Sequence, residues 1–228
     1  MLEETVRLKN TGFETRTLWD WMQLLIIPLA LTGGALYLQR AERTVERQST
    51  EIRAKLEREI ATDRQQEAAL QSYLDHMADL LLNENLLTSG NEELRNVARI
   101  RTLTVLRGLD ARRKGLLLLF LYESGLILER LIVDLDGADL SGAELYSANL
   151  SGANLVNVNL NRAELSTANL SGARLIKANL NRAQLIDTEL SGANLSEADL
   201  RDAKVSDQQL ATAQSLKLAT MPDGTIHE

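Results

Sequence analysis

The sequence predicts a four-sided β-solenoid over residues 131–205, preceded by an α-helical region with one N-terminal transmembrane helix. Three observations lead to this fold class. An apolar residue, almost always leucine, returns at every fifth position from Leu135. The stretch before it is rich in the helix formers Glu, Arg, Gln, Leu and Ala. The run from Trp21 to Leu38, near the start of the sequence, contains no charged residue. We expect five segments: a polar N-terminus (1–20), the transmembrane helix (21–38), a helical linker and N-terminal cap (39–130), the solenoid (131–205), and a capping helix with tail (206–228).

The five-residue period is the main evidence for the solenoid. The periodic residues are Leu135, Leu140, Leu145, Leu150, Leu155, Leu160, Leu165, Leu170, Leu175, Leu180, Leu185, Leu190, Leu195, Leu200 and Val205. A small residue, usually alanine, stands two positions before each of them. Residues two apart in an extended segment point the same way, so both side chains point inward. A turn every five residues then gives a square coil of 20 residues, and Ser-Gly-Ala does recur at that interval, at Ser151, Ser171 and Ser191.

The alternatives to a coil are a Leu-Ala-rich helix and a disordered tract. A helical period of 3.6 would scatter these leucines around the helix, so both alternatives fail. Each coil alone cannot bury its apolar atoms, and the stack is stable only as a whole. The interior is then solid Leu and Ala, which leaves no internal cavity for a ligand.

At these residues the chain resembles the pentapeptide-repeat family. The resemblance is carried by runs such as Ala138-Asp139-Leu140-Ser141-Gly142 and Ala153-Asn154-Leu155. It implies a right-handed quadrilateral β-helix. The preceding zone, with Tyr73–Leu82 and Val97–Gly115, resembles membrane-anchored bacterial members of the family, notably cyanobacterial ones. Most of those have no assigned activity, so the resemblance implies an architecture and little chemistry.

The uncharged run from Trp21 to Leu38 predicts the membrane span. Its 18 residues would make about 27 Å of helix, close to the thickness of a bilayer's hydrocarbon layer. Trp19, Trp21 and Tyr37 lie at its ends, where amphipathic rings favour the headgroup region. A buried core helix, an in-plane anchor and a signal peptide are the alternatives. Arginines and lysines are denser after the run than before it, which predicts a single-pass protein with a cytoplasmic C-terminal domain.

The helical middle predicts a long helix, a second helix and a cap. Residues 39–82 contain no Gly or Pro, and a second helix is expected from Glu92 to about Leu109. The early part is only sparsely apolar, so it is either a single exposed helix or one paired with a second copy, which makes the helical region a possible homo-oligomer contact. Arg112–Leu128 is too short to span a membrane, and we expect it to cover the open end of the solenoid.

Beyond Val205, the C-terminal segment predicts a second cap. Ser206 with Gln209 three residues later fits a capping box, which should start a short helix to about Leu218.

The composition offers little chemistry. There is no cysteine, which removes disulfides and thiolate metal sites. His76 and His227 are the two histidines, and neither belongs to a metal or catalytic pattern. A net charge of −7 argues against binding nucleic acid through a basic surface. We expect no catalytic residue, cofactor or metal, and an enzyme is the least favoured class.

The outer surface is where a binding function would lie. The candidate partner face stacks polar and basic side chains one coil apart: Asn159, Asn161, Arg162, Asn179, Asn181 and Arg182. A second face carries Tyr146 and Ile186, and a third is a plain Ser-Gly column.

Two functions remain open. The first is a membrane-tethered scaffold that presents the solenoid to an unknown, membrane-associated protein partner. The second, implied by the family resemblance, is a mimic of duplex DNA that protects topoisomerases. A mimic needs dense acidic rows, whereas 131–205 holds ten acidic against six basic residues. The scaffold is therefore the leading interpretation.

Overall fold

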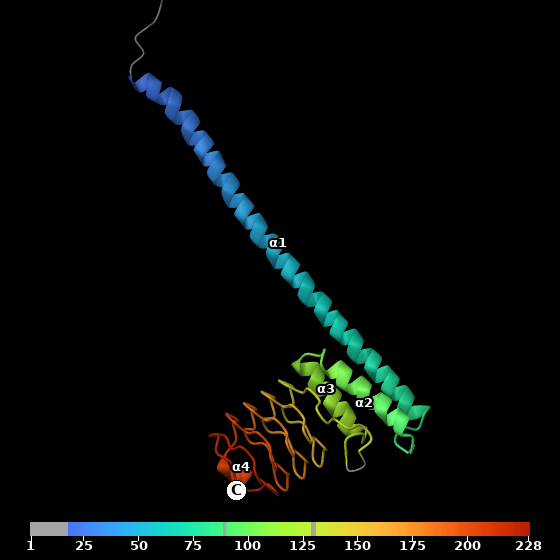
Figure 1. Ribbon diagram of the computed structural model, residues 1–228. Helices are drawn as coiled ribbons and strands as arrows, with labels where there is room; N and C mark the ends of the chain where they lie inside the picture. The colour runs from blue at the N-terminus through green and yellow to red at the C-terminus, as the bar shows by residue number, and fades with distance from the viewer. Residues whose placement is uncertain (1–17, 89, 129–130) are drawn as a thin grey trace, which may run out of the picture. The chain divides into compact units, whose positions relative to one another are not determined.

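The computed structural model describes residues 18–88, 90–128 and 131–228. The helices of these residues follow in the order α1 (Leu18–Leu82), α2 (Glu92–Leu106), α3 (Ala111–Glu123) and α4 (Asp207–Leu210) (Figure 1). The chain divides into two compact units, Met1–Ile60 and Ala61–Glu228, with the boundary inside α1. The polar N-terminus predicted for residues 1–20 lies outside the described residues as far as residue 17.

The described part of the first unit is helical. Residues 18–60 form the N-terminal part of α1, and Pro28 lies inside the helix. Ile52, Leu56 and Ile60 are all exposed and are spaced four residues apart on this helix. Nothing in the structure tests whether a second copy covers them, so the pairing of this segment stays a prediction.

The predicted transmembrane helix is wrong. Within the part of the chain that the structure describes, no helix combines the length and the apolar character that crossing a membrane requires. Residues 21–38 are a short section of the 65-residue α1, and Gln23, Thr32 and the Gly33–Gly34 pair dilute its apolar side chains. The side chains of Trp19 and Trp21, two of the expected membrane anchors, lie outside the described residues, and Tyr37 is exposed. The predicted single-pass localisation is withdrawn with the span.

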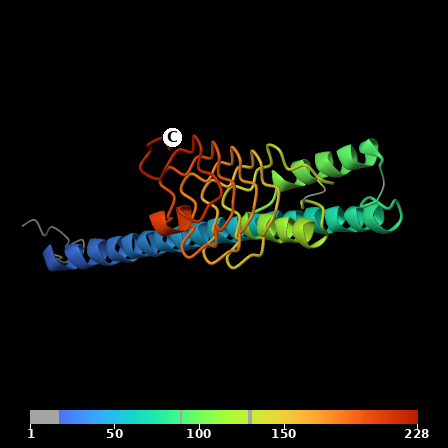
Figure 2. The ribbon, with the colours of Figure 1, turned by 90° about the horizontal axis from the view of Figure 1, so that it is seen from below.

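The second unit contains the solenoid, drawn as a stack of coils in Figure 2. Parallel bridges join residues 20 apart, as in Asp139↔Asn159, Asn159↔Asn179 and Asn179↔Asp199. The spacing equals four sides of five residues, so it confirms the expected square coil. Leu160 and Leu180 occupy one internal column and are fully buried, as are almost all the periodic leucines.

The core is the paired Leu and Ala columns. Burying a leucine side chain contributes about 1.5–3 kcal/mol, and alanine fills the remaining space without a polar atom. Thr188 stands where most repeats have alanine. Its buried hydroxyl donates to the Leu165 carbonyl at 2.7 Å, which satisfies the one polar atom that this exception brings into the core.

Backbone hydrogen bonds hold each coil to the next. The Leu160 amide donates to the Asn179 carbonyl at 2.8 Å, and the Asn179 amide donates to the Val158 carbonyl at 2.9 Å. The same pattern recurs on the other sides. Because these bonds repeat along the stack, the coils as far as Lys204 keep a length of 20 residues.

Each corner is a β-turn with a left-handed third residue. The Ala163 amide donates to the Leu160 carbonyl at 3.0 Å, and Arg162 between them has φ 58°. One positive φ at the third position is the requirement of a type II turn. Glycine adopts it without strain at five corners, Gly137, Gly142, Gly152, Gly172 and Gly192. At the other corners the positive φ falls on residues that carry a side chain, most of them polar.

α3 covers the N-terminal end of the stack, as Figure 1 shows. Leu117, Leu118 and Leu121 of this helix are fully buried. The Glu144 amide of the first coils donates to the Ala111 carbonyl at 3.0 Å. An open solenoid end would expose unpaired backbone groups, and this helix supplies acceptors for some of them.

Arg113 links α3 to the part of α1 that belongs to the second unit, residues 61–82. Its guanidinium contacts Asp63 at 2.7 Å and Glu67 at 3.0 Å, and it also pairs with Asp110. These carboxylates hold the pKa of Arg113 above its ordinary value, although burial opposes the shift. These ion pairs add to the apolar contact between the two helices, in which Tyr73 of α1 packs on Phe120 of α3 with the ring centroids 6.5 Å apart.

The C-terminal cap differs in extent from the prediction. The capping box is present, because the Ser206 hydroxyl accepts from the Gln209 amide while the Gln209 side chain accepts from the Ser206 amide. However, α4 ends at Leu210 rather than near Leu218. The chain then returns to the coil, with bridges Asn194↔Ser215 and Asp199↔Thr220, before an antiparallel bridge to Ile226 closes the end. The solenoid thus continues past residue 205.

Gly115 provides a test of the cap. A Cβ at this position would lie 2.1 Å from the Glu144 carbonyl oxygen, so Gly115→Ala forces α3 away from the first coils. We expect a loss of about 1–3 kcal/mol in the free energy of unfolding, typical of overpacking. Gly108→Ala is the matched control, because its new Cβ would meet its nearest neighbour at an ordinary 3.7 Å. Equal urea midpoints for the two variants would contradict the close approach.

Candidate interaction surface of the solenoid

The predicted partner face contains an internal hydrogen-bonded column. The Asn179 side-chain amide donates to Asn159 Oδ1 at 3.2 Å, and the Asn159 amide donates to Asp139 Oδ1 at 3.1 Å. Beside this column, Asn161 Nδ2 donates to Asn181 Oδ1 at 3.1 Å. All four asparagines are half-buried. Their amides therefore bond mainly from coil to coil.

The same asparagines also satisfy the backbone. Asn159 Oδ1 accepts the amide of Asn161 at 3.1 Å, and Asn179 Oδ1 accepts the amide of Asn181 at 3.0 Å. This is the Asx-turn geometry, in which the side chain bonds its own backbone two residues on. Equivalent bonds run from Ser171 to Asn169 and from Ser196 to Asn194. The residue before each inward leucine is thus largely a structural position.

Ion pairs close the column at both ends. At the N-terminal end, the Lys114 ammonium, with Lys114 only 6% exposed, donates to Asp139 at 3.0 Å and to the Ser141 carbonyl at 3.2 Å. Burial by itself would raise the pKa of Asp139, but the hydrogen bonds from Ser141 and Lys114 outweigh it and lower that pKa. At the other end the Arg201 guanidinium holds the pKa of Asp199 below its usual value.

Arg162 and Arg182 lie outside this column, at left-handed corners. Both side chains are exposed. Arg182 donates from Nε to Asp202 at 3.3 Å, one coil away, so part of its charge is compensated on the surface. The two arginines are the residues of the predicted partner face that remain turned toward solvent.

The second predicted face carries the large apolar side chains of the coil sides. Tyr146 is 69% exposed and Ile186 is 52% exposed. Ser166 occupies the same position in the coil between them, and the exposed carboxylates of Glu144 and Glu164 stand two positions before Tyr146 and Ser166. This face therefore offers two apolar contacts beside negative charge. The Ser-Gly column, by contrast, is partly used by the cap, because Ser151 Oγ lies 3.0 Å from the Tyr122 hydroxyl.

Within the residues that the structure describes, no group of three or more His, Cys, Asp or Glu side chains is placed to hold a metal ion. The side-chain amides of Asn159, Asn161 and Asn179 are engaged in bonds within the stack, and partner binding through this face stays a prediction. The sequence signal for this hydrogen bond is an Asn or Asp that stands two residues before a backbone amide without a partner on the neighbouring coil. Asn159 has this relation to Asn161.

A four-sided stack with a solid core, capped at both ends, defines a β-solenoid repeat protein. The family model described as pentapeptide repeats matches residues 133–162 and 163–202, with 8 copies. Residues 133–202 therefore match the sequence repeats of this family, and the four-sided coil of the structure agrees with the right-handed quadrilateral β-helix of pentapeptide-repeat proteins.

Two of the similar solved structures come from cyanobacteria. A pentapeptide repeat protein from Cyanothece 51142 is 38% identical, with 42% of this chain and 65% of that one covered and a TM-score of 0.36. HetL from Nostoc sp. strain PCC 7120, described as involved in heterocyst differentiation regulation, is 33% identical, with 40% and 52% covered and a TM-score of 0.24. This chain thus spans about half to two thirds of their length. A comparison with curated proteins gave no match.

Asn179→Ala tests the structural role of the column. The change leaves the Asn181 amide without its acceptor and removes one of the two donors to Asn159 Oδ1, which we expect to cost about 1–2 kcal/mol in the free energy of unfolding. Gln184→Ala is the control at the same repeat position, since the described residues give Gln184 no side-chain hydrogen bond. Thermal and urea denaturation would measure both. Equal stability of the two variants would show that Asn179 is an ordinary surface residue.

The lowered pKa of Asp139 predicts that the folded protein loses stability in acid. Its folded-state pKa is lowered, so it contributes stability above the unfolded-state pKa of about 3.9 and loses it as the pH falls through the folded value. We expect the stability difference between the wild type and Asp139→Asn to be constant above about pH 5 and to shrink below it. Urea titrations of both proteins across this range would measure it. A difference that does not change with pH would exclude the Lys114 pair as its cause.

Proposed function

We propose that the protein is a non-catalytic interaction scaffold, whose solenoid presents a rigid surface to a partner protein. The observation that carries this is the pair Tyr146 and Ile186, two large apolar side chains exposed on the side of an otherwise well-packed stack. Tyrosine is enriched among residues that dominate protein–protein binding energy. The neighbouring Glu144 and Glu164 favour a partner that combines apolar contacts with basic side chains.

Rigidity supports this role. The backbone around Tyr146 and Ile186 is held by the coil: the Leu145 and Ser147 amides donate to the Glu164 and Ser166 carbonyls, and the Ile186 carbonyl accepts from the Thr167 amide. Little backbone entropy therefore remains to be lost when a partner docks. The Asn159 and Asn179 amides are already bonded within the stack, and a partner would have to break those bonds to use them. We therefore place the docking surface on the Tyr146/Ile186 face, with Arg162 and Arg182 as the competing site.

Site-specific photo-crosslinking followed by double mutants tests this assignment. A photoreactive residue is placed at Ser166, between the two apolar side chains, and captured proteins are identified by mass spectrometry. We expect one reproducible partner, and we expect Tyr146→Ala with Ile186→Ala to weaken its binding by about tenfold or more. The matched control, Arg162→Ala with Arg182→Ala, should leave the affinity within about threefold.

Other outcomes of the double-mutant experiment would assign the docking site to a different surface. Loss of binding in the arginine pair alone would assign docking to the Arg162/Arg182 corner. Retained binding in both double mutants would remove the solenoid sides as the docking surface.

A further inference from the structure

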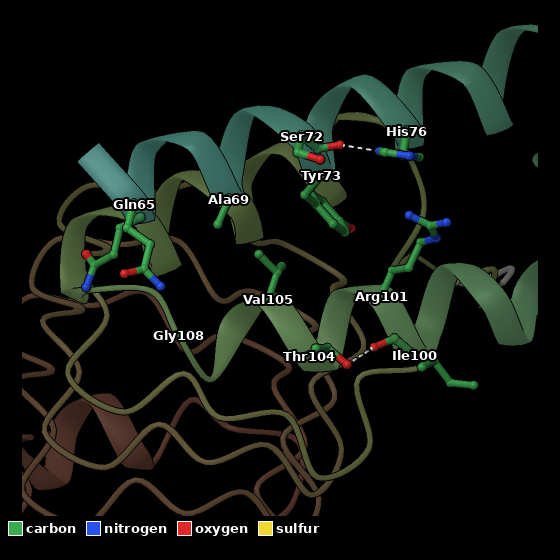
Figure 3. Close-up of a pocket in the computed structure, with 11 residues that line it drawn as sticks. Gln65, Ala69, Ser72, Tyr73, His76, Ile100, Arg101, Thr104, Val105 and Gly108 are labelled. Atoms are coloured by element: carbon green, nitrogen blue, oxygen red, sulfur yellow. Dashed lines mark hydrogen bonds between the residues drawn. The ribbon is translucent and has the colours of Figure 1, made fainter. Parts of the chain in front are cut away.

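A groove of about 430 Å³ runs between α1 and α2 of the second unit, and no sequence pattern had indicated it (Figure 3). Figure 3 shows Ala69 of α1 and Val105 of α2 facing each other across it, with Tyr73 projecting between the two helices. The groove is distinct from the solenoid faces, so its role does not depend on the function proposed above.

The floor of the groove is fixed. Tyr73 is almost fully buried, and its hydroxyl lies 2.7 Å from the Thr102 hydroxyl. Its ring packs edge-on against Phe120, with the centroids 6.5 Å apart. Burial raises the pKa of Tyr73 to about 12, so the floor is uncharged at neutral pH. A ligand would meet a preformed apolar surface here.

The walls are apolar but open to solvent. Ile100 is 61% exposed, an unusual state for isoleucine on a helix that already buries another face. The groove extends along α1 from Gln65 to His76, which at 1.5 Å per residue is about 16 Å, or three helical turns. This length and shape suit one amphipathic helix with apolar residues at i, i+4 and i+7.

The charged side chains that line the groove determine which charge a bound helix should carry. The lining includes no carboxylate, and it is closed at one end by Arg101 and His76 (Figure 3). Arg101 forms no ion pair with any residue in the described part of the chain. His76 Nδ1 donates to the Ser72 carbonyl at 2.6 Å, so a neutral ring keeps only an acceptor at Nε2, and the cation at this end of the groove is Arg101. The opposite end is lined by Gln65, Gln66 and Gly108, which carry no charge.

We infer that this groove docks an amphipathic helix of a partner protein, with an acidic residue in the helical turn that reaches Arg101. The apolar side chains of that helix pack on Ala69, Val105 and Ile100. The acidic residue supplies the charge that Arg101 lacks within the described structure, and the helix covers the exposed face of Ile100.

A library of synthetic helices tests this with the full chain. Each peptide has about 15 residues, because shorter helices are marginal in water. Leu, Ile, Met and Phe vary at i, i+4 and i+7, and a terminal turn carries either Glu or Lys. Binding is measured by fluorescence anisotropy. We expect the best Glu peptide to bind about fivefold more tightly than its Lys counterpart.

Three variants make the test specific. Arg101→Glu should reverse the preference for Glu over Lys. Ala69→Trp should abolish binding by filling the groove, and it is tolerated by the fold because Ala69 is exposed. Arg162→Glu, a matched charge change on the solenoid, should alter nothing. The inference is overturned if no peptide binds the wild type more tightly than Ala69→Trp, or if Glu and Lys peptides bind equally.

Discussion

The coil-to-coil backbone hydrogen bond is the constraint on which the rest of the solenoid depends. Between Leu140 and Leu185, the amide of each inward leucine donates to a carbonyl 19 residues further on, as Leu160 donates to Asn179. That bond can repeat only if each coil has the same length, which in turn requires a tight corner every five residues. The corners then demand a left-handed residue, and the inward positions accept only side chains that fill the shared core. Leucine, alanine and the corner glycines are therefore consequences of one hydrogen-bonding geometry.

The same geometry decides which surface positions are available for binding. Where the residue before the leucine is Asn or Asp, its side chain is drawn into turns and columns, as Asn159 and Asn179 show. On another side of the coil, Tyr146 and Ile186 follow the leucine and are exposed. A mimic of duplex DNA would need a continuous acidic row, but the row of Glu144 and Glu164 continues as Gln184 and Lys204. The structure therefore gives no observation that favours the topoisomerase-binding alternative.

The five-residue period allowed the leucine and alanine columns to be predicted, because each inward position is set by a local two-residue alternation. The capping box at Ser206 and Gln209 was equally local. The length of α4 was not, because Leu210 both ends the helix and fills the core, a tertiary role that helix propensity does not encode. The candidate site was only partly predictable: sequence placed Asn159 and Asn179 on one face but could not show that their amides bond to each other. The groove beside Tyr73 depends on how α1 and α2 pack, which no periodicity indicates.

The last coil differs from the others by one residue. Asn194 pairs with Ser215, 21 positions on, where the earlier bridges join residues 20 apart. The extra residue is taken up before Ser215, because the bridges at Ser215 and Thr220 again lie five residues apart and return the chain to the columns below. Insertion or deletion of whole coils between the caps would keep every column in register. The separation of the two ends then changes in steps of about 4.8 Å, the spacing of neighbouring strands.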